Sequence, residues 1–146
     1  MSEHTTQPTR VAFVCVQNAG RSQMATAFGE RERERRDLDV TILTGGTHPA
    51  DAVHDEVIET MAELDVDLSD RTPSGITAGE LRSCDYVATV GWSTLDLGET
   101  PSVDVRDWAL DDPDGQAPER VRDIRDEVES RVNARFDEIE TERAGA

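Results

Sequence analysis

A cysteine and an arginine separated by five residues are the side chains in this sequence best suited to chemistry. Cys15 ends an apolar run, and Arg21-Ser22 follows the loop VQNAG. Backbone N–H groups of such a loop, set before a helix, converge on one point, and the helix dipole makes that point attractive to anions. The planar guanidinium of Arg21 can bind two oxygens of a tetrahedral oxyanion. The predicted oxyanion-binding residues are Val16, Gln17, Asn18, Ala19, Gly20, Arg21 and Ser22.

Cys15, at the bottom of this loop, would be a nucleophile. The loop N–H groups, Arg21 and the Ser22 hydroxyl are expected to stabilise its thiolate. Gly20 can take positive φ without strain, and Asn18 tolerates the left-handed region and can tie the loop together. The alternative is that Cys15 is a small buried hydrophobe at a strand end and Arg21 a surface charge. The surrounding pattern favours the enzymatic interpretation.

Size and cysteine content indicate a single domain in a reducing compartment. The 146 residues fit one core, which we expect to span residues 9–142 between tails at residues 1–8 and 143–146. The sequence contains no apolar run of bilayer-spanning length, and its first residues are polar, so we expect neither a membrane span nor a signal peptide. Two cysteines without a paired framework indicate a cytoplasmic location rather than a disulfide scaffold.

The charge balance is strongly acidic. Asp and Glu number 32 against 15 basic residues, all of them Arg, for a net charge of −17. Nucleic acids and anionic membranes need a basic surface and are therefore not expected as partners. A lysine-free acidic surface resembles that of proteins from salt-rich cytoplasms, where screening over roughly 3 Å at molar salt weakens self-repulsion. We expect removal of salt to loosen or unfold the protein; equal melting temperatures in low and molar salt would contradict this.

Short apolar runs alternate with amphipathic segments along the chain. Strands are expected at residues 10–16, 40–43, 86–90 and 103–105. A helix should follow the loop, with Met24, Ala25, Ala27 and Phe28 facing inward and a solvated end at residues 30–36. Further helices are expected from a cap at Ala50-Asp51 to Leu64, over residues 78–82 with Thr77 as cap, and along a stripe from Val121 to Ile139. This alternation predicts an α/β fold, a single three-layer domain with a four-stranded parallel sheet flanked by helices.

Ligands of parallel sheets bind beyond the carboxyl ends of the strands. Asp111-Asp112-Pro113 follows the fourth expected strand. A carboxylic acid above the anion could protonate an oxygen that leaves phosphorus or arsenic. Pro113 fixes the backbone after Asp112, so Asp112 is the preferred general acid and Asp111 the second candidate.

We assign no catalytic role to the other candidate residues. Cys84 precedes the third strand, which places it roughly 15–20 Å from Cys15, beyond the reach of a disulfide; we interpret it as structural. His48 and His54 flank the loop after the second strand; one of them could touch the mouth of the site, but we interpret both as ordinary loop and helix-start residues. Trp92 and Trp108 could each line the pocket or cover the core. No metal-site spacing is found.

The sequence resembles the low-molecular-weight tyrosine phosphatase fold and, within it, the arsenate reductases, as a haloarchaeal-type member. The stretches that carry the resemblance are CVQNAGRSQMA, GGTHPADAVHDEVIETMAELDVDLSDRTP, DYVATV and WALDDPDGQAPERVRDIRDEV. The resemblance implies Cys15 as nucleophile, Asn18, Arg21 and Ser22 as oxyanion ligands, and Asp112 as general acid.

The sequence departs from these relatives at the resolving cysteines. Residues 91–101 contain no cysteine, and Gly20 occupies the loop position of a second cysteine in many relatives. The Ala19-Gly20 pair looks like the branch that uses a small-molecule thiol, and Thr26 replaces the carboxylate of potassium-binding members. We therefore favour an arsenate reductase without a bound cofactor, using an external low-molecular-weight thiol and a glutaredoxin- or thioredoxin-like partner. The alternatives are a phosphatase that forms a phosphocysteine intermediate and a non-catalytic oxyanion sensor.

Overall fold

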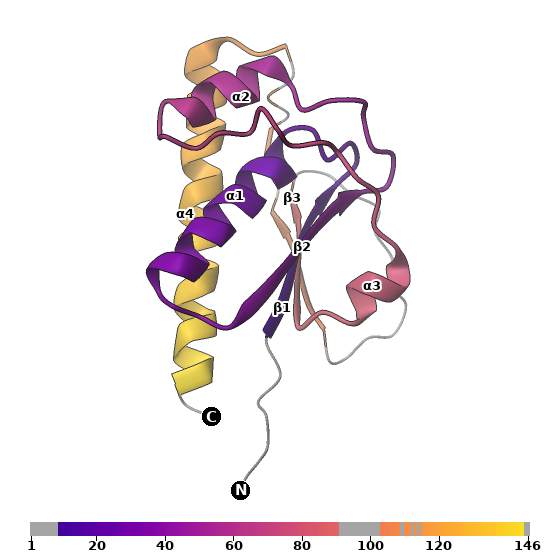
Figure 1. Ribbon diagram of the computed structural model, residues 1–146, viewed down its shortest axis with the longest axis vertical. Helices are drawn as coiled ribbons and strands as arrows, with labels where there is room; N and C mark the ends of the chain where they lie inside the picture. Colours follow the sequence, from indigo (N-terminus) through magenta and orange to yellow (C-terminus); the bar gives the residue numbers. More distant parts are fainter. Residues whose placement is uncertain (1–8, 91–102, 109, 112, 114, 145–146) are drawn as a thin grey trace, which may run out of the picture.

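Four parallel strands form the centre of the molecule. The computed structural model describes residues 9–90, 103–108, 110, 111, 113 and 115–144. The sheet has the order β2-β1-β3-β4, and every pairing is parallel (Figure 1). The strands are β1 (Thr9–Cys15), β2 (Val40–Gly46), β3 (Tyr86–Val90) and β4 (Asp104–Trp108). The predicted four-stranded parallel sheet is confirmed.

Helices cover both faces of this sheet. They are α1 (Arg21–Arg35), α2 (Asp55–Ala62), α3 (Ala78–Arg82) and α4 (Pro118–Ala144). Figure 1 shows α1 and α4 on one face and α3 on the other. The predicted stripe of α4 lies in the larger core with the inner face of α1, whereas Leu81 of α3 packs into a smaller cluster with Ala12 and Val14. None of the described helices is long and apolar enough to cross a membrane.

β2 continues three residues beyond its expected end at Leu43. Gly45 and Gly46, which lie beyond that expected end, pair with Val14 and Cys15. Both glycines meet close neighbours, since a Cβ on Gly46 would lie 2.5 Å from the carbonyl oxygen of Val16. The absence of a side chain therefore brings β2 into contact with the loop after β1.

α2 begins at Asp55 with His54 as its N-cap, so the expected cap at Ala50-Asp51 is wrong. The physical reason lies in the backbone hydrogen bonds of the preceding segment. The amides of Ala50 and His54 donate to carbonyl oxygens of the loop after β1, which prevents residues 50–54 from forming a helical turn.

The far end of α1, expected to be solvated, contains one buried carboxylate. Glu32 is only 3% exposed. Its oxygens accept hydrogen bonds from Arg35 at 2.8 Å and from Arg36 at 3.0 Å. A buried carboxylate is tolerated when it is paired in this way, so part of the alternating charge of this segment pairs Glu32 rather than facing water.

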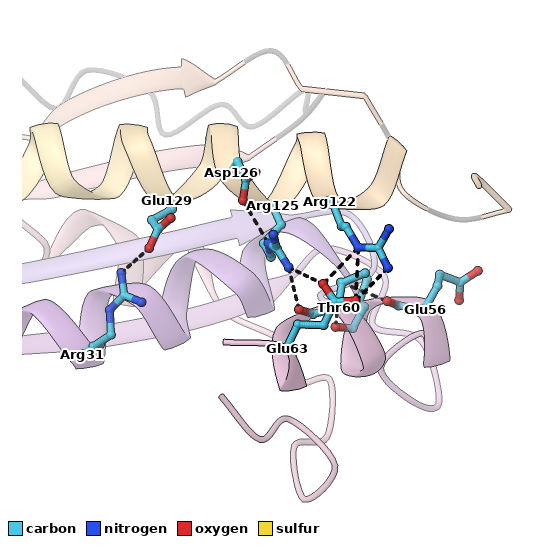
Figure 2. A network of polar contacts seen from close by, with 9 residues as sticks. Arg31, Glu56, Thr60, Glu63, Arg122, Arg125, Asp126 and Glu129 are labelled. Atoms are coloured by element: carbon cyan, nitrogen blue, oxygen red, sulfur yellow. Dashed lines mark hydrogen bonds and ion pairs between the residues drawn. The ribbon is translucent and has the colours of Figure 1, made fainter. Parts of the chain in front are cut away.

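A polar network joins α2 to α4 (Figure 2). Arg125 donates to the carbonyl oxygen of Thr60 at 2.9 Å and to Glu63 at 2.8 Å, and Arg122 binds the same carboxylate. The hydrogen bonds from Arg122 and Arg125 lower the pKa of Glu63 to about 2. This network fixes α2, and with it His54 at the start of α2.

Candidate active site

The cysteine and the arginine of the predicted loop open onto one cavity. Its volume is about 340 Å³, and its lining residues are Cys15, Val16, Gln17, Ala19, Gly20, Arg21 and His54. Cys15 ends β1 and Arg21 begins α1, so the cavity lies at the carboxyl edge of the sheet. This is the edge at which parallel sheets bind ligands.

Two donors face the sulfur of Cys15. The backbone N–H of Asn18 donates to Sγ at 3.1 Å, and Ser22 Oγ lies 2.9 Å from Sγ. Ser22 Oγ also accepts a hydrogen bond from Asn18 Nδ2 at 2.8 Å, and its own hydrogen is available to an ionised sulfur. Hydrogen bonds of this kind favour the thiolate over the thiol.

Asn18 holds the loop in shape. It is fully buried and has φ 53°, the left-handed conformation expected of it. Its Nδ2 also donates to Thr44 Oγ1 at 2.9 Å, and its Oδ1 accepts from Gln23 Nε2 and from the backbone N–H of Ser74, both at 3.0 Å. Gly20, also expected to use positive φ, instead has φ −139°.

The loop carbonyls are turned outward by the segment after β2. Four backbone hydrogen bonds run from Thr47 N to Cys15 O, from His48 N to Val16 O, from Ala50 N to Gln17 O and from His54 N to Ala19 O. In a trans peptide the N–H of the next residue points opposite to the C=O. The loop N–H groups therefore face away from this segment, as the bond from Asn18 N to Cys15 Sγ illustrates.

The start of α1 is open to an anion. Its N-cap is Gly20, no side chain caps it, and its first turn contains no acidic residue. The partial positive charge of a helix N-terminus is thus left without an internal counter-charge. Arg21 adds a full positive charge, and its Nη1 is anchored on the carbonyl oxygen of Leu110 at 2.5 Å.

Asp112, the preferred general acid, lies outside the described residues, but both of its flanks are placed. Leu110 contacts Arg21 as above, and Pro113 is buried against Gly20, where a Cβ would lie 3.1 Å from Pro113 Cγ. Asp111, the second candidate, forms an ion pair with Arg120 and lines a different cavity. The structure therefore does not bring Asp111 to Cys15, and the role of Asp112 remains a prediction.

The fold shows which of the described histidine and tryptophan candidates line the cavity. His54 lines the Cys15 cavity, as the alternative that one of the two histidines touches the mouth of the site allowed, and the preferred interpretation of His54 as an ordinary helix-start residue is incomplete. Trp108 is buried, with its ring centroid 5.9 Å from that of Phe13, and thus covers the core. Trp92 lies outside the described residues.

Cys84 lies at the opposite end of the sheet. It precedes Asp85, whose backbone N–H donates to Arg10 O near the start of β1. Its thiol donates to the carbonyl oxygen of Glu80 at 3.5 Å, and burial raises its pKa. Both cysteines are free, as expected for thiols at opposite strand ends.

Comparison with known proteins supplies relatives for this fold and cavity. The family model described as low molecular weight phosphotyrosine protein phosphatase matches residues 10–144. A putative arsenate reductase of Halobacterium salinarum is 66% identical over 133 residues, covering 90% of this chain and 93% of that protein.

Solved structures agree with this comparison. A thioredoxin-dependent arsenate reductase of Corynebacterium glutamicum matches with a TM-score of 0.77 and 29% identity, covering 95% of this chain but 65% of that longer one. An arsenate reductase in the phosphate binding state matches with a TM-score of 0.75 and 28% identity, covering 90% and 98%.

Proposed function

The chain belongs to the low molecular weight phosphotyrosine protein phosphatase family, and from this premise we propose that it is an arsenate reductase acting through the thiolate of Cys15. The observation that carries the proposal is the shared cavity of Cys15 and Arg21, with two hydrogen-bond donors on the sulfur. The relatives named as arsenate reductases support the choice of arsenate among tetrahedral oxyanions.

In the first chemical step, Cys15 Sγ attacks arsenic(V) in bound arsenate. An S–As bond forms, an As–O bond breaks, and the oxygen leaves as water after protonation, for which Asp112 supplies a proton. The loop N–H groups and Arg21 bind the remaining oxygens and stabilise the negative charge that develops on them.

In the second step, the sulfur of an external thiol attacks Cys15 Sγ. An S–S bond forms, and the electron pair of the S–As bond stays on arsenic, which leaves as arsenite, arsenic(III). A second thiol, small or carried by a glutaredoxin- or thioredoxin-like protein, then reduces the mixed disulfide and restores Cys15. The two electrons thus come from two thiols, and no bound cofactor is required.

The reductant is external because the chain offers no second thiol near the cavity. The sequence has two cysteines, and Cys84 is buried at the other end of the sheet, beside the carbonyl of Glu80. This chemistry needs reduced Cys15, which a reducing cytoplasm maintains.

A phosphatase is the second candidate, since the family name and the phosphate-binding relative show that related cavities accept phosphate. It would hydrolyse a phosphocysteine intermediate with Asp112 activating water. A phosphotyrosine substrate would need an aromatic side chain to stack on its ring, and of the two tryptophan candidates the one within the described residues, Trp108, is packed against Phe13. We therefore keep the reductase as the main proposal.

One pair of assays tests the proposal. The protein, in molar salt, is incubated with arsenate and a panel of small thiols while arsenite is measured, and separately with an aryl phosphate. We expect arsenite that depends on thiol and on Cys15, with Cys84→Ser as the matched active control. Rapid aryl phosphate turnover without thiol-dependent arsenite would reverse the order of the two functions, and turnover of neither would favour an oxyanion sensor.

A further inference from the structure

His54 is held at the cavity by its backbone. Its N–H donates to the carbonyl oxygen of Ala19 at 3.0 Å. Its own carbonyl oxygen accepts the N–H groups of Val57 and Ile58, both at 3.1 Å, which starts α2. The residue is therefore fixed on one side by the oxyanion loop and on the other by a helix that Arg122 and Arg125 attach to α4.

The imidazole lies on the rim above Gly20. A Cβ built on Gly20 would be 3.6 Å from His54 Cδ2 and 3.1 Å from Pro113 Cγ. The ring is half-buried and lines the same cavity as Cys15 and Arg21. An anion in that cavity would thus have the ring of His54 and the ring of Pro113 on the side of Gly20.

Among the described residues, few charged groups surround His54, so a positive charge on its imidazole would change the binding of an anion in the cavity. Apart from Cys15, Arg21 and His54, every residue lining the cavity is uncharged. On α2, Asp55 is exposed and Glu56 accepts the N–H of Gly115 at 3.4 Å.

On the segment after β4, Asp111 is already paired with Arg120. In a chain of net charge −17, a protonated imidazole would be the second cation of the cavity, and its effect on a dianion would be strong in a partly enclosed site.

We propose that His54 is a specificity residue of the oxyanion site: its imidazolium contacts the bound tetrahedral anion, and the site therefore binds anions more weakly when the ring is neutral. This inference rests on the proposed function, because it assigns a further ligand to the same anion. It distinguishes dianions from monoanions, since the second positive charge favours the more highly charged ligand.

Sulfate is the probe, because it remains a dianion across the relevant pH range. The Cys15→Ser protein serves as parent, which removes the titration of the nucleophile. Sulfate affinity is measured at pH 5.5 and pH 8 in molar sodium chloride for the parent, for the parent with His54→Gln, and for the parent with His48→Gln as the matched control.

We expect the parent to bind sulfate about fivefold more tightly at the lower pH, where an imidazole carries its proton. The His54→Gln protein should lose this pH dependence, and the His48→Gln protein should retain it. In the parent, the carbon-bound proton of His54 followed by NMR should titrate at a higher pH when sulfate is present, a readout that a structural role would not change.

Retention of the pH dependence by His54→Gln, or a His54 titration that sulfate does not move, would overturn this inference and leave the oxyanion site intact. Absence of sulfate binding to the parent at either pH would overturn the site itself, and with it both proposals.

Discussion

The two cysteines of this protein are equally buried, with exposures of 4% for Cys15 and 3% for Cys84, but their surroundings are opposite. The sulfur of Cys15 faces a backbone N–H and a hydroxyl, whereas the thiol of Cys84 donates to a carbonyl oxygen. At Cys84, burial is the largest cause of the raised pKa, although hydrogen bonds from Ser83 and Arg10 oppose it. The place of Cys15 in the anion-binding loop before α1, rather than its burial, distinguishes the nucleophile from the structural residue.

The helices beside the two cysteines differ in the same way. α3, next to Cys84, begins with a complete capping box in which Thr77 and Glu80 satisfy each other's backbone N–H groups. α1, next to Cys15, has Gly20 as its N-cap and no side-chain cap. The cap of α3 stabilises that helix, whereas the uncapped N-terminus of α1 is available to a ligand.

Replacement of each cysteine by serine gives the largest expected difference in activity. Cys15→Ser should lower the rate of arsenite formation by at least about a thousandfold, because the nucleophile is lost. Cys84→Ser should remain within about twofold of the parent protein. Initial rates in molar salt check both, and a comparable loss in the two variants would end the distinction drawn between the sheet ends.

Removal of the side chain that organises the loop should have the next largest effect. Asn18→Ala removes the side-chain hydrogen bonds that tie the loop to Ser22, Thr44 and the Ser74 amide, so we expect a loss of about a hundredfold in kcat/KM and about 1–3 kcal/mol of stability.

The matched control for Asn18→Ala is Thr77→Ala, which removes the α3 cap. It should cost about 1 kcal/mol of stability while activity stays unchanged. Steady-state kinetics and urea denaturation separate the two effects, and loss of activity in Thr77→Ala would contradict the separation.

Removal of a single donor to the sulfur should have a smaller effect. In a Cys84→Ser background, Ser22→Ala should slow the alkylation of Cys15 by iodoacetamide at pH 7 several-fold, because one hydrogen bond to the thiolate is lost. Ser83→Ala, whose hydroxyl bonds the carbonyl of Glu80, should leave the alkylation rate unchanged. An unchanged rate in Ser22→Ala would show that Ser22 does not act on the sulfur.

Cys84 gives the smallest expected effect, on stability at alkaline pH. Burial raises the pKa of its thiol, so the folded state retains the proton at a pH where the unfolded state has lost it. The free energy of unfolding should therefore decline as pH rises above the unfolded value of about 8.5. Urea denaturation at pH 7 and pH 9.5 measures the decline, which should be smaller in Cys84→Ala; an equal decline would assign it to other groups.

The nucleophile loop was predictable from sequence because its chemistry is local. Cys15, Asn18, Arg21 and Ser22 lie within one strand–loop–helix unit, and the donors on the sulfur come from that unit. The same holds for α3, where Thr77 and Glu80 are three positions apart. Local spacing was sufficient in both cases.

The supports that come from other strands were not predictable in this way. Thr44 and Ser74 reach Asn18 only after β2 has paired with β1, and Gln23 is an inconspicuous residue in the first turn of a helix. The pairing of Asp111 with Arg120 likewise depends on where α4 packs. One sequence signal could have identified Thr44. It directly precedes Gly45-Gly46, and a Gly-Gly pair at the end of a strand indicates close contact with a neighbouring loop.

The outward-turned carbonyls of the oxyanion loop imply that anion recognition depends on the backbone of two segments, the loop after β1 and residues 47–54. Side chains at Thr47, His48 and Ala50 can change without altering the amides they donate. A proline at Ala50, or a residue inserted or deleted between positions 47 and 54, would remove or misalign a donor and let a carbonyl turn toward the anion. Length and backbone conformation in this stretch are therefore more tightly constrained than its amino-acid identities, so insertions and deletions there should be far less tolerated than substitutions.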